Sequence, residues 1–170
     1  MENTPVHDIE LYSYETFKTL LDHEVNRSRR YGDPLTLIHL AVETEVSEEY
    51  IQQAAYAQHG AEVFAINVLN LQVRDTDIPC RRDNEFLVLM PATDDAGGRV
   101  VCERLEKLFH IESQIYDKVS FTLSTYIGMA SLPGDRLLLS SQLLSNASQA
   151  LEHARANHLQ KAVVFSDIKN

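Results

Sequence analysis

Apolar residues along the chain follow two spacings, and each spacing predicts one kind of element. Positions that recur about every 3.6 residues predict helices with one buried face, and short apolar runs predict buried strands. Helices are expected over residues 13–30, 50–73, 94–109 and 145–157, and strands over residues 35–42, 86–90, 119–130 and 162–165. The stretch 50–73 is one long helix or two helices that break near Gly60. Because helices alternate with strands, the pattern predicts an α/β sandwich.

The segments between these elements are polar and predict connections. Residues 1–10 are expected to form a flexible N-terminal arm, and residues 11–170 are expected to form a single domain. The acidic stretch 43–49 is expected to be a connection, residues 74–84 a loop or the lip of a hairpin, and residues 132–135 a turn.

Charge and composition restrict the possible partners. The 170 residues carry 15 Lys and Arg against 25 Asp and Glu, a formal net charge of −10, which argues against nucleic-acid binding. That balance still allows a local basic pocket for a small anion. The N-terminus lacks the basic and apolar regions of a signal peptide, and no apolar stretch approaches the ~20 residues of a membrane helix. A cytoplasmic protein without membrane insertion is therefore expected.

Cysteine and histidine usage predicts neither a metal site nor a cofactor. Cys80 and Cys102 are too few for a disulfide framework or a metal cluster, and both are expected to be reduced, buried thiols. The histidines do not pair at i,i+4 spacing. His39 lies inside an apolar strand and is expected to be a core residue whose hydrogen bonds are satisfied.

The densest cluster of charged residues lies between residues 74 and 86. It interleaves arginines with aspartates: Arg74, Asp75, Asp77, Arg81, Arg82 and Asp83. An arginine fork suits phosphate groups and the O6/N7 edge of guanine, and a carboxylate can accept hydrogen bonds from guanine N1 and N2. Arg74 and Asp77 on a turn therefore form a candidate clamp for a guanine nucleotide. The alternative is a solvated loop whose charges neutralise one another.

Three stretches of sequence together resemble one protein family. They are LTLIHLAV at 35–42, RDTDIPCRRDNEFLVLMP at 74–91, and FTLSTYIGMA at 121–130 followed by NASQALEHARA at 146–156. The chain, over about residues 11–166, resembles the GGDEF domain of diguanylate cyclases, which condense two GTP molecules into cyclic di-GMP. The resemblance implies a nucleotidyl-cyclase-like α/β sandwich with a central, mostly antiparallel sheet flanked by helices.

The signature hairpin of that family departs from its usual pattern here. Glu85 and Phe86 match its end, but Arg82, Asp83 and Asn84 stand where the family has Tyr-Gly-Gly-Asp/Glu, one residue short. In the family the glycines let the hairpin backbone approach the GTP phosphates, and the acid holds Mg²⁺. Asn84 is a neutral and poorer metal ligand, and Asp83 adds repulsive charge.

Other metal and nucleotide positions of the family are changed as well. Ala41 replaces the aspartate near the end of the first strand, and Glu43 is a displaced substitute for it. The family's guanine- and ribose-binding residues are missing from 45–60, and Arg155 stands where a lysine is usual. Phosphoryl-type transfer depends on metals that neutralise charge. The chain is therefore predicted to be a degenerate GGDEF domain without cyclase activity.

The Arg-x-x-Asp motif is retained, and in the family it forms an inhibitory site that binds cyclic di-GMP. The leading hypothesis is a cyclic di-GMP receptor, in which Arg74 contacts a phosphate or guanine O6/N7 and Asp77 accepts from guanine N1 and N2. Arg81 matches the family's arginine before the signature and joins the predicted site. Further candidate cations, from a neighbouring helix or a second subunit, are Arg27, Arg29 and Arg30.

Two alternatives to the receptor remain open. The first is a protein-interaction or dimerisation module that has lost all ligands, with an unknown protein partner or a second copy as its target. The second is residual binding and slow hydrolysis of GTP or ATP, for which Glu43, Glu45, Glu85 and Arg155 would have to form an improvised metal site.

Overall fold

A computed structural model describes residues 11–116, 121–132 and 138–168, and of residues 112–116 it describes the backbone only. The arm predicted over residues 1–10 and most of the turn predicted at 132–135 lie outside the described residues. Within the described ranges, no helix combines the length and the apolar character that crossing a membrane requires.

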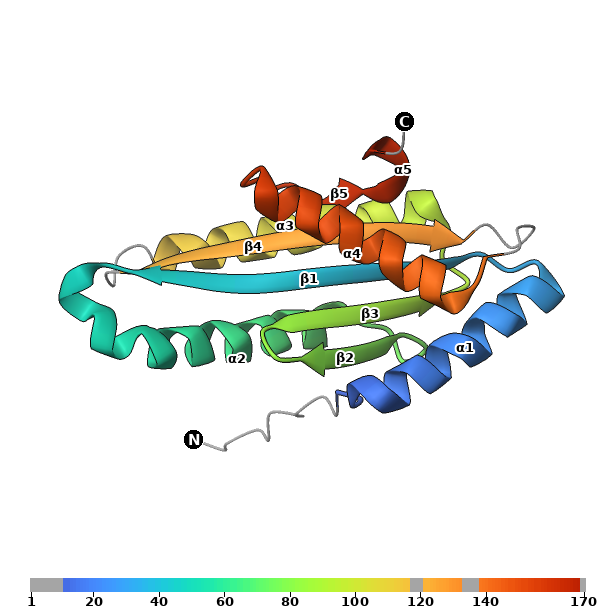
Figure 1. The fold of residues 1–170 in the computed structure, drawn as a ribbon, viewed down its shortest axis with the longest axis horizontal. Helices are drawn as coiled ribbons and strands as arrows, with labels where there is room; N and C mark the ends of the chain where they lie inside the picture. Colours follow the sequence, from blue (N-terminus) through green and yellow to red (C-terminus); the bar gives the residue numbers. More distant parts are fainter. Residues whose placement is uncertain (1–10, 117–120, 133–137, 169–170) are drawn as a thin grey trace.

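The elements follow the predicted alternation, with one additional strand and two additional short helices (Figure 1). In chain order they are α1 (Tyr14–Tyr31), β1 (Leu35–Val46), the 3₁₀ helix η1 (Glu48–Gln53), α2 (Ala54–Gln72), β2 (Ile78–Arg82), β3 (Glu85–Pro91), α3 (Asp95–Tyr116), β4 (Phe121–Leu132), α4 (Ser140–Ala156), β5 (Val163–Val164) and α5 (Phe165–Ile168). Ser13 caps α1, since its side chain accepts a hydrogen bond from the backbone N–H of Thr16.

The five strands form one sheet in the order β2-β3-β1-β4-β5. Every neighbouring pair is antiparallel except β4 and β5, which are parallel. β1 and β4 form the centre of the sheet, and their pairing runs from Leu35 opposite Leu132 to Val46 opposite Phe121. The predicted α/β fold with a mostly antiparallel central sheet is thus confirmed.

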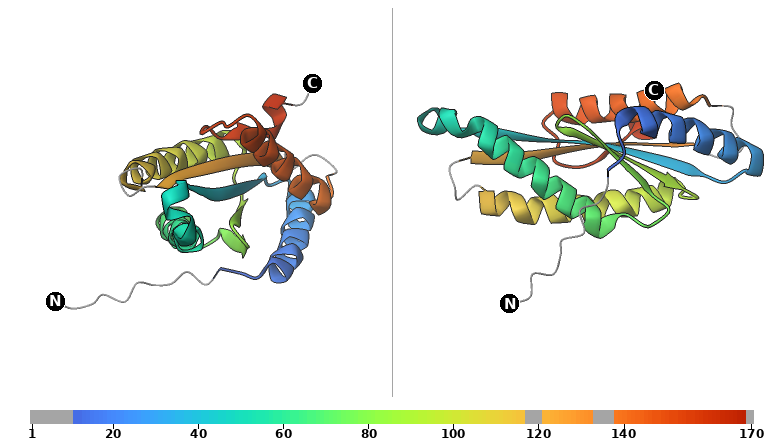
Figure 2. Two further views of the ribbon diagram at one scale, coloured as in Figure 1. Left: turned by 60° about the vertical axis from the view of Figure 1, so that its left-hand side comes forward. Right: turned by 90° about the horizontal axis from the view of Figure 1, so that it is seen from below.

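Helices cover both faces of this sheet (Figure 2). Ile38 and Leu40 of β1 belong to the core beneath α2 and α3. Leu37 and Ala41 belong to the cores beneath α1 and α4. Successive side chains of a strand point to opposite faces. A strand that is covered on both faces therefore needs an almost continuous apolar run, which is what residues 35–42 supply.

β1 is longer than the sequence pattern predicts. The acidic stretch 43–49 was expected to be a connection, but β1 continues through Glu43 and Glu45 to Val46. Pairing with β4 explains the extension, because β4 supplies a partner residue for every position of β1 up to its end. The carboxylate of Glu43 is consequently fixed on a strand rather than carried by a loop.

Several other boundaries differ from the prediction. The one-helix alternative for 50–73 is right from Ala54 to Gln72, where α2 passes Gly60 without a break, but residues 50–53 belong to η1. The helix predicted to end near residue 109 continues to Tyr116, and the helix predicted from residue 145 already begins at Ser140. The strand predicted at 162–165 is shortened to Val163–Val164. These elements are set by packing against the sheet, which a local pattern does not report.

Residues 74–84 are more ordered than a loop. A turn at residues 75–76 leads into β2, which pairs with β3 from Ile78 opposite Leu89 to Arg82 opposite Glu85. Asp83 and Asn84 form the two-residue turn of this hairpin, and Asp83 has the positive φ of 56° that such turns require. The prediction of a hairpin lip is therefore right for 83–84, and the loop prediction is wrong for 78–82.

Gly128 allows α4 to lie unusually close to β4. A Cβ atom at this position would lie 2.2 Å from the backbone nitrogen of Leu151 and 2.5 Å from the carbonyl oxygen of Ala147. Any side chain would therefore push the helix away from the strand. The close approach matters because α4 carries three polar side chains, Ser148, Glu152 and Arg155, toward one end of the sheet.

Candidate functional site

Arg74 and Asp77 form a closed local turn. The carboxylate of Asp77 accepts hydrogen bonds from the backbone N–H of Arg74 at 2.8 Å and from its Nη2 at 3.0 Å. Nη2 also donates to Oγ1 of Thr93 at 2.7 Å and to the carbonyl oxygen of Pro91 at 3.3 Å. The guanidinium is thus held on one side by the end of β3 and the chain that follows it. We call Arg74, Asp77, Pro91 and Thr93 the Arg74 turn.

Arg74 and Asp77 differ in exposure. The side chain of Arg74 is 55% exposed, whereas that of Asp77 is 4% exposed. An incoming ligand therefore meets the guanidinium first. Guanine N1–H and N2–H could reach Asp77 only if they replaced the hydrogen bonds that Arg74 now donates. In the observed geometry Asp77 orients Arg74, and Arg74 is the group that faces solvent.

Arg81 does not lie beside Arg74. Arg81 pairs with Phe86 near the hairpin turn, whereas Arg74 precedes the other end of β2. Its Nη2 donates to Glu62 of α2 at 2.9 Å, and its Nε donates to the carbonyl oxygen of Asp83 at 3.0 Å. The guanidinium also lies 5.9 Å from the ring centre of Phe86. The contacts of Arg81 therefore join α2 to the hairpin.

The remaining predicted arginines lie elsewhere. Arg82 stacks over the ring of Tyr14, with 4.6 Å from its guanidinium carbon to the ring centre. Arg27 pairs with Glu24 on the same helix. Arg29 and Arg30 are exposed in the last turn of α1. The structure thus brings only Arg74 and Asp77 together among the residues predicted to bind cyclic di-GMP.

Asn84 turns back toward the first strand. Its side-chain nitrogen donates to the backbone carbonyl oxygen of Val42 at 3.4 Å, and its backbone carbonyl oxygen accepts a hydrogen bond from the backbone N–H of Val42 at 3.3 Å. The position that carries a metal-binding acid in the family is therefore used here as a hydrogen-bond donor within the protein. Asn84 therefore lacks the negative charge of the acid, and its side-chain nitrogen is held by Val42.

Arg155 joins two carboxylates from different strands. Its Nε donates to Glu43 of β1 at 2.7 Å, and its Nη2 donates to Glu85 of β3 at 3.2 Å. Its Nη1 donates to Glu152, one turn earlier on α4. The side chains of Arg155 and Glu85 are only about one quarter exposed, at 26% and 25%. A fixed organic cation thus lies between the two carboxylates.

His39 extends this arrangement into the core. Its Nε2 donates to the second oxygen of Glu85 at 2.7 Å, and its Nδ1 lies 3.0 Å from Oγ of Ser148, within hydrogen-bond distance. The prediction of a core histidine with satisfied hydrogen bonds is confirmed. We call His39, Glu43, Glu85, Ser148 and Arg155 the Arg155 cluster.

These contacts change the acidity of Glu85. The hydrogen bond from His39 lowers the pKa of its carboxyl from 4.5 to about 2; partial burial opposes this shift, and Arg155 reinforces it. Glu85 is therefore ionised throughout the physiological pH range. Both of its carboxylate oxygens accept hydrogen bonds within the protein, one from His39 and one from Arg155.

The residues at this end of the sheet do not fit a magnesium site. Mg²⁺ prefers carboxylate oxygens and water in octahedral geometry. Ala41 has no ligand atom, Asn84 donates to a backbone carbonyl, and Glu43 and Glu85 are bound to Arg155. Glu45, the fourth residue of the improvised metal site, is exposed further along β1. Within the described residues, no three His, Cys, Asp or Glu side chains are grouped as metal ligands.

Both cysteines are free and buried, as predicted. Burial raises the pKa of Cys80 to about 11 and that of Cys102 to about 12. Neither thiol is therefore a nucleophile at neutral pH.

The sequence grouped Glu43, Glu85 and Arg155 and placed His39 in the core, but Ser148 and the contacts among these residues were missed. The spacing of His39 and Glu43 was a usable signal, because residues two or four apart on a strand lie on the same face. The family resemblance placed Glu43, Glu85 and Arg155 in one candidate site, but the sequence did not indicate that Arg155 would bind both carboxylates directly, since these contacts span 112 and 70 positions.

Comparison with known proteins agrees with this fold. The sequence profile of the family described as "Diguanylate cyclase, GGDEF domain" matches residues 10–161, so the chain belongs to the GGDEF domain family. A comparison with curated proteins gives no match.

Solved structures share the architecture at low sequence identity. The active GGEEF domain of a diguanylate cyclase from Vibrio cholerae is 16% identical, with a TM-score of 0.72 over 92% of this chain and 98% of that chain. The GGDEF domain of YfiN from Pseudomonas aeruginosa is 19% identical, with a TM-score of 0.70 over 91% and 96%. The GGDEF domain of DgcB from Caulobacter crescentus, solved in complex with c-di-GMP, is 16% identical, with a TM-score of 0.67 over 91% and 89%.

Proposed function

We propose that this chain is a non-catalytic GGDEF domain that acts as a receptor for cyclic di-GMP rather than as a cyclase. The observation that carries the loss of activity is the position of Arg155 between Glu43 and Glu85. Each carboxylate that could replace a lost metal ligand already has a cation of the chain as its partner. A divalent ion would have to displace a guanidinium that is held by three carboxylates.

Phosphoryl-type transfer also needs a backbone that can approach the phosphates. The turn at Asp83 and Asn84 carries two side chains and one negative charge where the family has glycines. Asp83 repels the triphosphate, and Asn84 is tied to Val42. Lost metal ligands and an obstructed phosphate approach together support a domain that does not turn over GTP.

The receptor part of the proposal rests on the Arg74 turn. Arg74 presents a half-exposed guanidinium whose direction is set by Asp77 and Thr93. A guanidinium held in this way suits a phosphate oxygen or the O6/N7 edge of guanine, because less conformational freedom is lost on binding. In this geometry Asp77 is a positioning residue, and full use of its carboxylate by guanine would require Arg74 to rotate toward a phosphate.

Two measurements test the proposal. Incubation with GTP and Mg²⁺ or Mn²⁺, followed by chromatography, is expected to yield no cyclic di-GMP; product formed by the wild type and lost in Glu85→Gln would refute the loss of activity. Calorimetric titration of cyclic di-GMP without metal is expected to show binding that Arg74→Ala weakens at least tenfold. Arg104→Ala, which removes an exposed arginine on α3, serves as the matched control.

The titration also decides between the receptor and the remaining alternative. Equal binding by wild type and Arg74→Ala would remove Arg74 from the site. Absence of binding at ligand concentrations well above the micromolar range would overturn the receptor and leave a nucleotide-independent interaction module.

A further inference from the structure

One buried polar side chain differs from all the others in its hydrogen bonding. Six of the polar residues that the structure describes are buried: Ser28, Thr36, His39, Asp77, Thr93 and Thr125. Five of them hydrogen-bond through their side chains to other groups of the chain. The hydroxyl of Thr125 forms no hydrogen bond within the described residues, although Thr125 is only 6% exposed. Buried hydroxyl groups are nearly always paired.

The two other buried threonines show how this fold pairs such a hydroxyl. Oγ1 of Thr36 donates to the carbonyl oxygen of Thr93 at 2.8 Å and lies 2.8 Å from Oγ of Ser131. Oγ1 of Thr93 donates to the carbonyl oxygen of Pro91 at 3.2 Å. Thr125 is as deeply buried as Thr93 but has no comparable contact among the described residues. Burial of a threonine in this core therefore does not by itself explain Thr125.

Thr125 also interrupts an apolar face of β4. Leu123, Thr125 and Ile127 alternate along the strand and so share one face. Leu123 and Ile127 belong to the core beneath α2 and α3. A valine has nearly the shape of a threonine and would complete this face without burying an unpaired hydroxyl, which is costly. The packing of the core thus does not account for the hydroxyl group.

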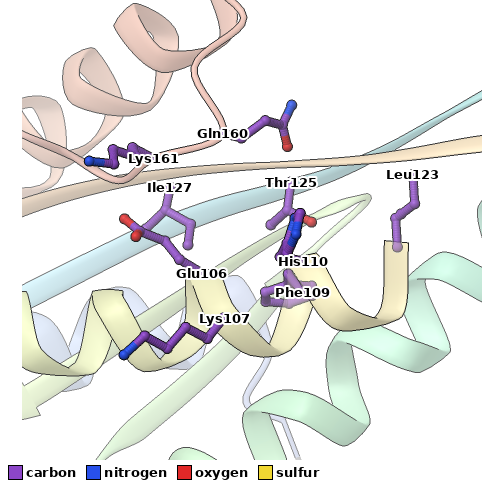
Figure 3. A pocket seen from close by; sticks show the side chains of 9 residues that line it. All are labelled: Glu106, Lys107, Phe109, His110, Leu123, Thr125, Ile127, Gln160 and Lys161. Atoms are coloured by element: carbon purple, nitrogen blue, oxygen red, sulfur yellow. The ribbon is translucent and has the colours of Figure 1, made fainter. Parts of the chain in front are cut away.

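Thr125 lines a cavity of about 250 Å³ between α3, β4 and the chain that precedes β5, and Figure 3 shows its side chain pointing toward α3. Phe109, Leu123 and Ile127 line the same cavity with apolar groups, and all three are buried. The ring of Phe109 stands edge-on to that of Phe64, with ring centres 5.6 Å apart and planes at 87°. This contact holds the aromatic wall in place. The cavity thus combines apolar walls with one hydroxyl group on its β4 side.

The volume of the cavity limits the size of its ligand. An engineered cavity of about 150 Å³ in another protein binds benzene. Sites for drug-sized molecules begin at about 300 Å³. The cavity beside Thr125 lies between these values, at about 250 Å³. It therefore suits a molecule with one substituted ring or two fused rings.

The charges around the cavity balance one another. Lys107 and Lys161 line it together with Glu106, and Glu103 shares the neighbouring hollow with Glu106 and Lys161. His110 is the one other titratable side chain among the described lining residues. Two lysines beside two glutamates select neither an anion nor a cation, and the apolar walls disfavour both. The surroundings therefore favour a neutral ligand.

We propose that this cavity binds a small neutral aromatic molecule whose ring carries one hydrogen-bonding group, such as a phenol. The ring packs against Phe109, Leu123 and Ile127, as aromatic walls favour. Its polar group forms a hydrogen bond with the Thr125 hydroxyl, which both donates and accepts. The site is independent of the receptor function, because it shares no residue with the Arg74 turn or the Arg155 cluster.

Matched probes test the proposal on the intact chain. They are p-cresol, which has a ring and a neutral hydroxyl, toluene, which lacks the hydroxyl, and 4-methylbenzoate and 4-methylbenzylamine, which carry a charge. Each probe is titrated into the protein and followed by backbone amide NMR. We expect p-cresol to bind about fivefold more tightly than each of the others, the factor that one hydrogen bond supplies. The shifted amides should lie on β4 and α3.

Three variants locate the contact on the protein. Thr125→Val removes the hydroxyl and is expected to weaken p-cresol about fivefold, to the level of toluene, and to leave toluene unchanged. Thr125→Ser keeps the hydroxyl and should retain most of the affinity. Thr122→Val makes the same change at an exposed position of β4 and should alter nothing. Because an unpaired hydroxyl is removed, Thr125→Val is also expected to raise the urea midpoint of the free protein.

The outcomes support or overturn the proposal as follows. Preferred binding of p-cresol that Thr125→Val removes, with a raised urea midpoint, supports it. Equal affinity of p-cresol for the wild type and Thr125→Val would overturn it, as would the absence of binding by every probe. Tighter binding of either charged probe would overturn the neutral ligand. A lowered urea midpoint of Thr125→Val would mean that the hydroxyl has a partner in the free protein, which also overturns the proposal.

Discussion

The Arg74 turn and the Arg155 cluster are built from the same chemistry but treat their arginine differently. Arg74 pairs with a carboxylate three residues away and keeps more than half of its side chain exposed, at 55%. Arg155 binds carboxylates from β1, β3 and its own helix and is 26% exposed. The first arrangement holds a cation ready for a ligand. The second satisfies its charges internally, so an incoming metal or phosphate finds no unpaired partner there.

This difference bears on the proposed function, in which the domain loses cyclase activity and keeps a ligand site. Arg74 stays available to a ligand because more than half of its side chain is exposed, although Asp77 pairs with it. A metal site is blocked where the chain itself supplies the counter-charge, as Arg155 does for Glu43 and Glu85. Arg74 and Asp77 precede β2, whereas Glu85 begins β3, so changes to one site are expected to leave the other intact.

The largest effect is expected from Gly128→Ala, which breaks the support of the Arg155 cluster. A methyl group there would collide with the backbone of α4, at 2.2 Å and 2.5 Å from Leu151 and Ala147. We expect a loss of about 2–3 kcal/mol of unfolding free energy, measured by urea titration. Gly97→Ala is the control, since its Cβ would meet only side-chain atoms at 3.2 Å, and it should be nearly neutral. Equal stability of both variants would contradict the close approach of α4.

A smaller loss is expected from Arg155→Met, which leaves Glu43 and Glu85 without their shared cation. The pairs are partly exposed, so the expected cost is about 1–2 kcal/mol, between the values for surface and buried ion pairs. Combining Arg155→Met with Glu43→Gln should cost less than the sum of the two single changes. Strict additivity in such a double-mutant cycle would mean that the two side chains do not interact in solution.

The Arg155 cluster is also expected to make stability depend on pH. Folding lowers the pKa of Glu85 from 4.5 to about 2, chiefly through the hydrogen bond from His39. Its stabilising contribution is therefore complete above pH 4.5 and is lost as the pH falls toward 2, by about 1–2 kcal/mol after allowance for its partial exposure. Thermal unfolding of the wild type and of Glu85→Gln between pH 2 and 6 measures this loss of stability. The two curves should converge at low pH, and parallel curves would contradict the assignment.

At the Arg74 turn, Asp77→Ala is expected to cost about 1 kcal/mol. The change removes the acceptor for the backbone N–H of Arg74 and for its guanidinium. Asp77→Asn keeps an acceptor oxygen and should lose about half as much. Chemical denaturation gives both values. If Asp77→Ala were neutral while binding of cyclic di-GMP disappeared, Asp77 would be a direct ligand contact rather than a positioning residue.

The smallest effect on stability is expected from Arg74→Ala, at about 0.5 kcal/mol or less, because the side chain is half exposed. The same change is expected to weaken cyclic di-GMP at least tenfold. This separation of stability from binding is the sharpest contrast with Arg155→Met, which should lower stability and leave binding unchanged. Calorimetry and denaturation of both variants measure the contrast directly, and a reversed pattern would contradict it.

The local sequence pattern determined most of the helices and strands of this protein and one of its two charged sites. The 3.6-residue spacing and the apolar runs predicted four helices and four strands, because each periodicity is a property of neighbouring residues. The same locality explains the Arg74 turn. Arg74 and Asp77 are three residues apart, so a turn brings them together whatever the rest of the chain does. Three stretches of sequence were enough to indicate the family that the sequence profile shows.

Only the tertiary structure decided the arrangements that join distant segments. β1 continues through Glu43 because β4 pairs with it, α4 approaches because residue 128 is a glycine, and Arg155 reaches Glu85 across 70 positions. Strand register, strand length and helix approach are set by long-range packing, in which each contact depends on the others. The sequence pattern does not report which distant residues come into contact. These contacts decide which charged side chains remain available to a ligand.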